Sequence, residues 1–318
     1  MSVRVISKQE VERLMPVAEC IQPMAEALVA LTRGELLNPL RTVLRPEGAG
    51  SYMALMPAYR PDPPLYSLKT ACVNPANTRL GIDTHQGFIG LFDGVTGQPR
   101  ALVNAGAITA IRTAAVSALA TRLLARPGSS TLAILGSGTQ ARSHLEGIRA
   151  VLPIERVLVW SRTPGNGSKL DGVVEVATAQ EAVCEADVVV TATAAPEPIV
   201  ERAWLKEGTH VNAVGSAKAT TRELDSATMA AAALYVDRRE SALNESGDYL
   251  FAAADGAIGP DHIRGEIGEL VIGSVGGRES DSELTVFKSL GLAVQDMFAA
   301  EHVLRLAERD GAGVEIEF

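Results

Sequence analysis

Short continuous apolar runs recur between residues 131 and 237, with stretches of helical spacing between them. Such runs are typical of parallel strands that are buried on both faces. We predict six of these strands: Leu132–Leu135, Arg156–Trp160, Val173–Val176, Asp187–Thr193, His210–Gly215 and Leu234–Asp237. Because helical stretches such as Thr139–Leu152 alternate with them, the pattern predicts an α/β fold with a Rossmann-type, doubly wound parallel sheet.

Residues 41–103 have a different pattern, in which strand-like segments are separated by Pro, Gly and Asp turns. It predicts five strands: Thr42–Arg45, Ser51–Met56, Leu65–Val73, Gly87–Phe92 and Arg100–Val103, the last two joined as a hairpin. A further strand is predicted at Val3–Ile6, followed by a helix with a capping box of Ser7 and Glu10. Longer helices are predicted at Pro16–Arg33 and Ala107–Ala125.

The C-terminal segment Thr285–Arg309 has apolar residues at helical spacing, which predicts a long amphipathic helix. Since this segment continues well past the last predicted strand of the parallel sheet, we expect it to pack on the N-terminal domain. The predicted organisation is an α+β domain of residues 1–118 and 288–318, into which the α/β domain of residues 119–287 is inserted.

The first strand of the parallel sheet ends in a G-x-G-x-x-A motif, which is a dinucleotide-binding fingerprint. Gly136 permits the sharp turn, Gly138 lets the backbone approach a pyrophosphate, and Ala141 lets the helix pack closely on the strand. The motif alone is weak, because Gly-rich turns end many strands, but its strand–turn–helix–strand context favours a dinucleotide site. The candidate cofactor-binding residues are Gly136, Ser137, Gly138, Thr139, Gln140 and Ala141.

The end of the second strand indicates which nicotinamide cofactor is preferred. An NAD-preferring fold usually has Asp or Glu there, to accept a hydrogen bond from the ribose 2′-OH. This chain has Ser161 and Arg162 instead, a hydroxyl and a guanidinium that suit a 2′-phosphate. We therefore expect NADP(H) to be preferred, with NAD(H) as the second cofactor; the alternative is that Arg162 is an ordinary solvated arginine.

Composition and charge exclude several classes of function. The 318 residues are 47% hydrophobic and 21% charged, as in ordinary globular proteins. A formal net charge of −9 argues against general binding to nucleic acid or to an anionic membrane. The three cysteines are scattered without metal-ligand spacing, and the first residues lack the apolar core of a signal peptide. We expect a cytoplasmic protein without a metal site.

Three separated cations in the first half of the chain, Arg45, Lys69 and Arg112, are candidate anion ligands. Lys69 lies in a largely apolar strand, so its charge needs a partner. No acidic residue lies two positions away from it along the strand, which makes a bound carboxylate one candidate partner. The alternative is a structural ion pair, or a lysine whose ammonium extends to solvent.

The chain resembles the ornithine cyclodeaminase/mu-crystallin family nearly from end to end. The matching segments are Leu55–Pro57, Lys69, Gly87–Asp93 with Gly97, Leu102, Thr109–Thr113, Leu135–Ala141, Val211–Gly215, Arg222–Asp225 and Thr285–Gly291. The resemblance implies a homodimer built through the N-terminal domain, which is then both the substrate-binding and the dimerisation domain.

The resemblance also implies roles for individual residues. Arg45, Lys69 and Arg112 would hold the carboxylate of an amino or imino acid substrate, with Lys69 and Arg112 as the catalytic residues. Thr84, Arg112 and Thr113 would line the nicotinamide and phosphate end of the cofactor.

Two departures separate this chain from the cyclodeaminase branch of the family. That branch has a Glu and an Asp for the second amine of its substrate, where this chain has Ala54 and Ala217. Neither alanine accepts a hydrogen bond from an ammonium group. The branch is also NAD-dependent, with an acidic residue near the position of Ser161 and Arg162. Both departures resemble the mu-crystallin-like ketimine reductases, which use NAD(P)H.

The sequence thus predicts an NAD(P)H-dependent reductase of cyclic imino acids, such as 1-pyrroline-2-carboxylate or 1-piperideine-2-carboxylate, with L-proline or L-pipecolate as product. A protonated imine is already electrophilic, so no strong acid is required. His85 is a candidate proton donor and Lys218 a candidate polar wall of the pocket, although a structural histidine and a solvated lysine are the plainer interpretations. The alternative functions are an ornithine cyclodeaminase, a dehydrogenase of alanine or N-alkyl amino acids, and a non-enzymatic NADPH-dependent binding protein.

Overall fold

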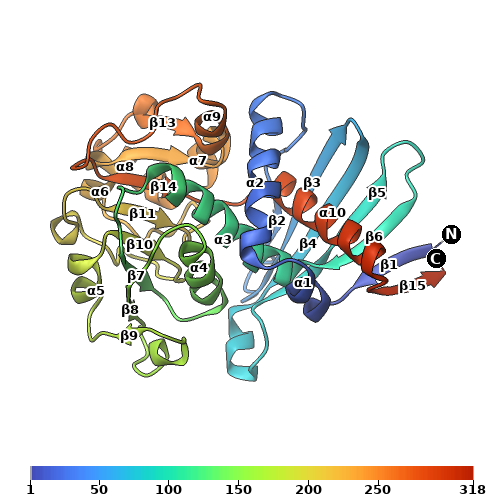
Figure 1. The fold of residues 1–318 in the computed structure, drawn as a ribbon, viewed down its shortest axis with the longest axis horizontal. Coiled ribbons are helices and arrows are strands. Elements are labelled where there is room, and N and C mark those ends of the chain that lie inside the picture. Colours follow the sequence, from blue (N-terminus) through green and yellow to red (C-terminus); the bar gives the residue numbers. More distant parts are fainter. Residues whose placement is uncertain (1, 318) are drawn as a thin grey trace. The chain divides into compact units, whose positions relative to one another are not determined.

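The computed structural model describes residues 2–317, without the side chain of Thr78. Its contacts divide the chain into two compact units (Figure 1). Unit 1 consists of Met1–Arg112 and Leu292–Phe318, and unit 2 of Thr113–Gly291. The chain therefore enters unit 2 from unit 1 and returns to unit 1 at its C-terminal end. The limits predicted from the sequence, 118 and 288, lie a few residues inside unit 2.

Unit 1 contains a sheet of seven strands in the order β15-β1-β6-β5-β4-β3-β2. The strands are β1 Ser2–Ile6, β2 Thr42–Leu44, β3 Tyr52–Pro61, β4 Pro64–Val73, β5 His85–Asp93, β6 Pro99–Asn104 and β15 Val314–Glu317. All neighbours are antiparallel except β1 and β6. The predicted hairpin of β5 and β6 is confirmed. Sequence reasoning missed β15, a short exposed edge strand that pairs with β1.

Helices cover one face of the unit 1 sheet. These are α1 Lys8–Leu14, α2 Val17–Thr32 and α10 Ala293–Asp310, and a 3₁₀ segment, η1 Pro75–Leu80, precedes β5. The predicted capping box of Ser7 and Glu10 begins α1. Helix α10 packs on α2 and on strands β3 to β6, so the expected return of the C-terminal helix to the N-terminal domain is confirmed (Figure 1).

Unit 2 contains a sheet of eight strands in the order β13-β12-β14-β11-β10-β7-β8-β9. The strands are β7 Thr131–Leu135, β8 Arg156–Trp160, β9 Val174–Glu175, β10 Val188–Thr191, β11 His210–Ala213, β12 Ala233–Val236, β13 Ile263–Glu266 and β14 Thr285–Lys288. Every neighbouring pair is parallel. The predicted α/β class with a doubly wound parallel sheet is confirmed.

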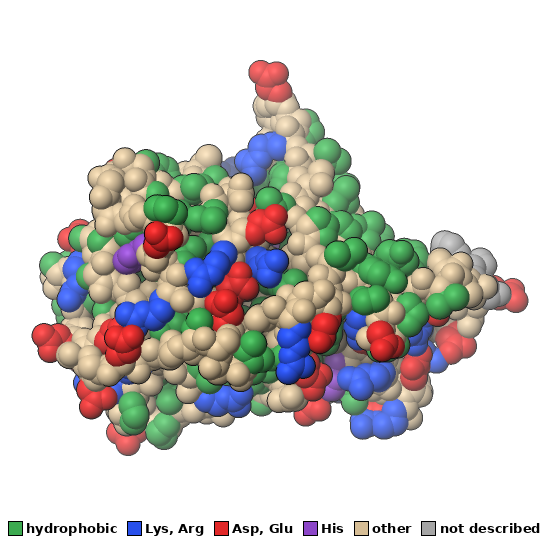
Figure 2. All heavy atoms as spheres, turned by 90° about the horizontal axis from the view of Figure 1, so that it is seen from above, with side chains coloured by type: hydrophobic (Ala, Val, Ile, Leu, Met, Phe, Trp, Pro, Cys, Tyr) green, Lys and Arg blue, Asp and Glu red, His purple; other side chains and the backbone are tan. Residues whose placement is uncertain are grey.

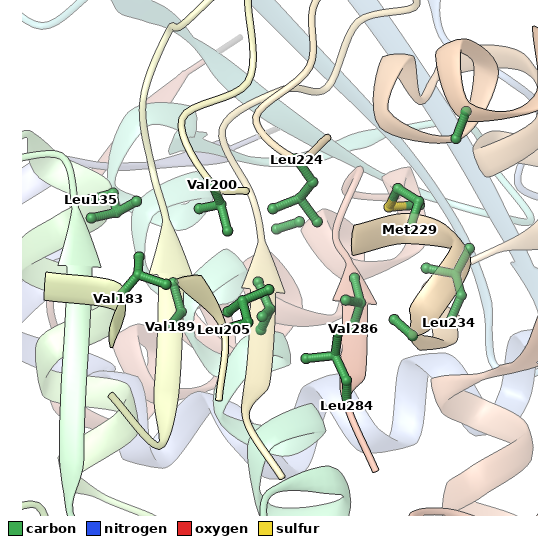
Figure 3. Close-up of a cluster of buried hydrophobic side chains, with 14 of the residues drawn as sticks. Leu135, Val183, Val189, Val200, Leu205, Leu224, Met229, Leu234, Leu284 and Val286 are labelled. Atoms are coloured by element: carbon green, nitrogen blue, oxygen red, sulfur yellow. The ribbon is translucent and has the colours of Figure 1, made fainter. Parts of the chain in front are cut away.

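Both faces of the parallel sheet are covered by apolar side chains. Along β7, Ala133 and Leu135 belong to one buried cluster, and Leu132 and Ile134 belong to another. Figure 3 shows the first cluster. The covering helices are α3 Ala105–Leu124, which crosses the limit between the units, α4 Thr139–Arg149, α5 Ala179–Glu185, α6 Ser226–Ala231, α7 Arg239–Glu245, α8 Gly247–Ala254 and α9 Ile267–Ile272, with 3₁₀ segments η2 Gly167–Lys169, η3 Arg202–Trp204 and η4 Pro260–His262.

One predicted element is wrong at its start. The segment 285–309 is not one helix, because Thr285–Lys288 forms β14 between β11 and β12, and the helix begins only at Ala293. All four residues of β14 are buried. Phe287 is fully buried, so a residue taken for the apolar side of a helix lies in the middle of a sheet. The sheet has β13 and β14 in addition to the six predicted strands.

Among the described helices, α3 has the length and composition of a membrane span, and 83% of the tested stretch is buried within the fold. Helices α1 and α2 pass the same test only as a pair, and they are bent by 86° at the break between them. A helix that is buried to this extent is typical of the core of a folded domain. The many alanines of α3 allow neighbouring elements to pack closely against it.

Candidate functional site

Lys69 lies on the helix-covered face of the unit 1 sheet. Along β4 every second residue from Leu65 to Val73 is buried, and this alternation directs the Lys69 side chain inward, where it is 5% exposed. Its Nζ lies 3.2 Å from both carboxylate oxygens of Asp296, in the first turn of α10. The buried lysine therefore has a structural ion pair. The sequence did not indicate it, because 227 residues separate the partners.

Arg112 joins the same carboxylate from α3. Its Nε donates to Asp296 Oδ1 at 3.0 Å, and its Nη1 donates to Oε1 of Gln295 at 3.2 Å. Both Arg112 and Asp296 are almost fully buried. We call Lys69, Arg112, Gln295 and Asp296 the polar cluster of unit 1. The structure brings together two of the three cations that the sequence singled out.

The polar cluster is short of acceptors. Asp296 supplies one negative charge to two buried cations. The Gln295 amide nitrogen, Nε2, is buried and has no hydrogen-bond partner among the described residues. Burial lowers the pKa of Lys69 to about 8, and the charges of Arg112 and Arg41 add to this, while Asp296 opposes it. An arrangement with surplus buried donors and positive charge is suited to bind an anion.

The third cation, Arg45, lies elsewhere on the unit. It directly follows β2, is exposed, and its guanidinium lies over the ring of Tyr52, 4.6 Å from the centroid. The two ion pairs that Asp296 makes within the described chain go to Lys69 and Arg112. Arg45 is thus not one of the residues that the structure gathers around Asp296.

The two alanines that replace the acidic residues of the cyclodeaminase branch, Ala54 and Ala217, lie in different units. The register of β3 and β4 pairs Met56 with Lys69 and Ala54 with Ala71, so Ala54 faces the same side of the sheet as Lys69. Ala54 is buried there and offers no polar atom on its side chain. Ala217 lies in unit 2, in the loop after β11, next to the exposed Lys218.

Residues near the start of β5 and in the middle of α3 were also singled out. Thr84 immediately precedes β5, and its hydroxyl lies 3.0 Å from Nδ1 of the exposed His85. Thr113 follows Arg112 in α3 and is buried. Arg112 is the last residue of the first segment of unit 1, and Thr113 is the first residue of unit 2.

The predicted fingerprint forms the turn between β7 and α4. Gly136 has φ +125°, and a Cβ at this position would lie 2.5 Å from the carbonyl oxygen of Ala192. Only glycine fits there without strain. At Gly138 a Cβ would meet nothing within 4 Å, so space is open beside the backbone. Ala141 is fully buried against the sheet. Each position thus has the geometry that the motif requires.

Gly138 is also the N-cap of α4, and no side chain caps this helix start. The first backbone N–H groups of α4, beginning at Thr139 and Gln140, lie where an anion receives both hydrogen bonds and the helix dipole. Open space, a sharp glycine turn and an uncapped helix together fit the pyrophosphate of a dinucleotide.

The loop after β8 lies beside this turn. The hydroxyls of Ser137 and Ser161 share a hydrogen bond of 3.0 Å, which joins the fingerprint to the end of β8. Arg162 follows and is exposed. A cavity of about 280 Å³ adjoins Ser161, and Glu175 is among its lining residues.

Glu175 shapes the same loop. Its carboxylate accepts hydrogen bonds from the backbone N–H groups of Gly165, Gly167 and Ser168 at 2.8, 3.2 and 3.1 Å. These bonds hold the pKa of Glu175 below its usual value although burial opposes them. Sequence reasoning did not find Glu175, because its partners are backbone groups.

A buried charged network holds the loop that follows β11. Glu223 accepts hydrogen bonds from the Thr191 hydroxyl, from the Thr193 hydroxyl and N–H, and from the Gly215 N–H. Asp248 accepts from the N–H groups of Glu223 and Leu224 and pairs with Lys288 at 2.9 Å, where both side chains are fully buried. Burial raises the pKa of Glu223.

No group of three or more His, Cys, Asp or Glu side chains within residues 2–317 has an arrangement that could hold a metal ion.

A parallel sheet in which a strand ends in this glycine turn is typical of dinucleotide-binding α/β proteins. The chain belongs to the ornithine cyclodeaminase/mu-crystallin family, whose model matches residues 1–310, and the resemblance seen in the sequence is confirmed.

Three similar proteins represent the comparison. The chain is 39% identical over 308 residues to the ketimine reductase mu-crystallin of Mus musculus, covering 94% of this chain and 95% of that protein. A Thermococcus litoralis Delta(1)-pyrroline-2-carboxylate reductase, solved with NADH and L-proline, has a TM-score of 0.95 and 36% identity, covering 99% of this chain and 100% of that one. An archaeal alanine dehydrogenase, solved as a dimer with bound NAD, has a TM-score of 0.93 and 32% identity, covering 100% of both chains.

Proposed function

We propose that this protein is an NAD(P)H-dependent reductase of cyclic imino acids, which converts 1-pyrroline-2-carboxylate or 1-piperideine-2-carboxylate to L-proline or L-pipecolate. The observation that carries the proposal is the polar cluster, in which Lys69 and Arg112 share the single carboxylate of Asp296. The similarity to a ketimine reductase and to a reductase solved with L-proline supports the same substrate class.

Lys69 and Arg112 bind the substrate carboxylate in this proposal. The family resemblance assigns Arg45 to the same carboxylate, although Arg45 is exposed after β2 and lies outside the polar cluster. Binding the carboxylate fixes the orientation of the ring, so the contribution of these residues is positioning. When the imine nitrogen of the substrate is protonated, its carbon is already electrophilic, so no strong protein acid is required. When bound, NAD(P)H supplies the hydride that reduces the C=N bond.

The cofactor assignment extends to individual residues. Gly136, Ser137, Gly138, Thr139, Gln140 and Ala141 receive the pyrophosphate, and Thr84, Arg112 and Thr113 line the nicotinamide and phosphate end. Ser161 and Arg162 receive a 2′-phosphate, so NADP(H) is preferred over NAD(H). The exposed Arg162, directly after Ser161, supports this preference, since a guanidinium pairs with phosphate in two hydrogen bonds.

The protein acts as a homodimer in this proposal, with unit 1 as the dimerisation domain. Helices cover one face of the unit 1 sheet, whereas the opposite face carries the exposed Tyr66 and Phe88 on the adjacent strands β4 and β5. Figure 2 shows hydrophobic side chains gathered along one side of the molecule. A second copy that covers this face accounts for its apolar character.

The proposed location is the cytoplasm. Cys20 is buried and Cys72 and Cys184 are exposed, and all three are unpaired in the described structure. Free thiols are usual in a reducing compartment.

The direct test is a panel of cyclic imino acids, measured by the loss of reduced-nicotinamide absorbance with NADPH and with NADH. We expect turnover of the five- or six-membered ring substrate, faster with NADPH. Binding of NADPH without oxidation in the presence of every imine would contradict the proposal and favour a binding protein.

The same assay separates the other enzymes. Ala54 and Ala217 offer no partner to a second ammonium group, so ornithine with NAD should yield neither ammonia nor proline. An alanine or N-alkyl amino acid dehydrogenase would instead prefer pyruvate with ammonia or an alkylamine over the cyclic imines.

A further inference from the structure

Asp296 occupies the centre of the polar cluster and touches both cations. It is 1% exposed and lies in the first turn of α10, where the helix dipole stabilises a negative charge. Its Oδ1 accepts from Arg112 Nε, and Oδ1 and Oδ2 both accept from Lys69 Nζ. Because β4, α3 and α10 are far apart in the chain, this carboxylate is what joins the two cations into one site.

We propose that Asp296 is a positioning residue of the reductase, which keeps Lys69 charged and holds the Arg112 guanidinium in the orientation that receives the substrate carboxylate. This inference rests on the proposed function. Asp296 itself needs no contact with the substrate for this role, since it acts through Lys69 and Arg112.

The balance of charges around Lys69 supports the role. Burial, Arg112 and Arg41 all disfavour the protonated ammonium, and Asp296 is the group that favours it. Cys20, which faces the cluster from α2, contributes no charge, since burial raises the pKa of its thiol. The other ion pairs that α10 makes with strands of the described unit 1 sheet, Arg60 with Glu301 and Arg100 with Glu308, involve neither cation.

Geometry supports the second half of the role. Arg112 has Nε on Asp296 and Nη1 on Gln295, which fixes the plane of the guanidinium and leaves the other N–H groups of Arg112 for a further acceptor. The Gln295 Oε1 also accepts from the backbone N–H of Leu292, so it cannot rotate away without losing a helix cap.

The test is Asp296→Asn, which keeps the shape of the side chain and removes its charge. We would measure kcat/KM for the cyclic imino acid between pH 6 and pH 9, in the wild type and in the variant. The ratio of the two values cancels the ionisation of the substrate itself. In the variant Lys69 loses its proton at lower pH, so the basic limb of the profile should move down by at least about one pH unit.

The deficit of Asp296→Asn should therefore grow with pH. We expect kcat/KM about 10- to 100-fold below the wild type at pH 8.5, and within about threefold at pH 6, where Lys69 is protonated in both. The matched control is Glu301→Gln, which removes an ion pair from the same helix without touching Lys69 or Arg112. Its pH profile should be that of the wild type.

A uniform loss at every pH in Asp296→Asn, with the basic limb unmoved, would overturn the inference in favour of a purely structural role. Should that variant not fold, Lys69→Arg gives a second decision, because arginine stays charged without help. The kcat/KM of Lys69→Arg divided by that of the wild type, in which the ionisation of the substrate cancels, should then rise as the pH increases above about 8, and a ratio that stays constant with pH would overturn the inference as well.

The inference and the proposed function fail separately. If the wild type turns over no imine, the function is wrong, and the pKa of Lys69, measured by NMR of its side chain in the wild type and in Asp296→Asn, then tests Asp296 alone. A pKa that is equal in both proteins, or higher in Asp296→Asn, would overturn the role of Asp296.

Discussion

Lys69 and Arg112 are the two residues on which the proposed chemistry depends most directly. Each directs a charged donor into a buried site, and hydrogen bonds of this kind contribute about 1.5–3 kcal/mol. We predict that Lys69→Ala and Arg112→Ala each lower kcat/KM by about 10- to 150-fold. Arg60→Ala is the matched control, since Arg60 pairs with Glu301 outside the cluster. If a folded Lys69→Ala or Arg112→Ala variant has the same kcat/KM as Arg60→Ala, that residue does not bind the substrate carboxylate.

The pH dependence of the wild type follows from the same lysine. Burial lowers the pKa of Lys69 from 10.5 to about 8, so the ammonium that we propose to bind the substrate carboxylate is present below pH 8 and is lost above it. We predict that kcat/KM falls as the pH rises through about 8, approaching tenfold per pH unit. Steady-state kinetics up to pH 9.5 check this. A profile that stays flat over that range would mean that Lys69 keeps its proton or does not bind substrate.

The proposed preference for NADPH depends on Arg162. Its guanidinium gains from a 2′-phosphate and has nothing to gain from a 2′-OH, so Arg162→Ala should weaken NADPH by about 10- to 100-fold and leave NADH nearly unchanged. Arg156→Ala is the control, because Arg156 is an exposed cation at the opposite end of the same strand, β8. KM values for both cofactors decide the point. Equal weakening of NADH and NADPH would make Arg162 an ordinary surface arginine.

Sequence reasoning found the residues that carry a recognisable motif and missed those that support them. Gly136, Gly138 and Ala141 were predictable because each has a backbone or packing reason within one turn of the chain. Asp296 was not, because nothing local marks an aspartate in a helix as the partner of a lysine 227 residues away. Glu175 was missed because it binds backbone amides, which leave no pattern in the sequence.

At the scale of elements, β14 is the most informative disagreement with the pattern. Thr285, Val286 and Phe287 are β-branched or aromatic residues, which favour a strand, but their apolar positions also continue the spacing of α10. Local periodicity alone therefore does not distinguish a short buried strand, placed directly before an amphipathic helix, from the first turn of that helix. The pairing of β14 with both β11 and β12 resolves the ambiguity, and this long-range contact is absent from local periodicity.

The placement of β14 predicts a large stability effect. Phe287 is fully buried in the middle of the sheet, so Phe287→Ala should lower the free energy of unfolding by about 3–5 kcal/mol through lost burial and the cavity left behind. Denaturant unfolding measures this. Phe251→Ala, at a position that is 38% exposed on α8, should cost much less. Equal and small losses in both variants would contradict the buried position of Phe287.

At the scale of the whole molecule, the division into two units follows from how each segment buries its apolar residues. The alternating strands of unit 1 bury one face under α2 and α10, whereas the continuous apolar strands of unit 2 are covered on both faces. That difference in pattern is visible in the sequence, and it is why the fold class was predictable. The exact limits at Arg112 and Leu292 were not, because α3 continues unbroken through the first of them.

The helices of unit 1 cover one face of its sheet, and the opposite face leads to the final prediction. Tyr66 and Phe88 are 47% and 45% exposed on the face of the sheet away from the helices, and an apolar surface of this kind favours association with a second copy. A charge placed in the middle of a self-complementary interface is met by its symmetry mate and loses its hydration. We therefore expect Phe88→Glu to convert a dimer to monomers, as measured by sedimentation velocity. Ile272→Glu, at an exposed apolar position in unit 2, should leave the dimer intact. A wild-type protein that sediments as a monomer, or a Phe88→Glu variant that stays dimeric, would mean that this face is not the interface.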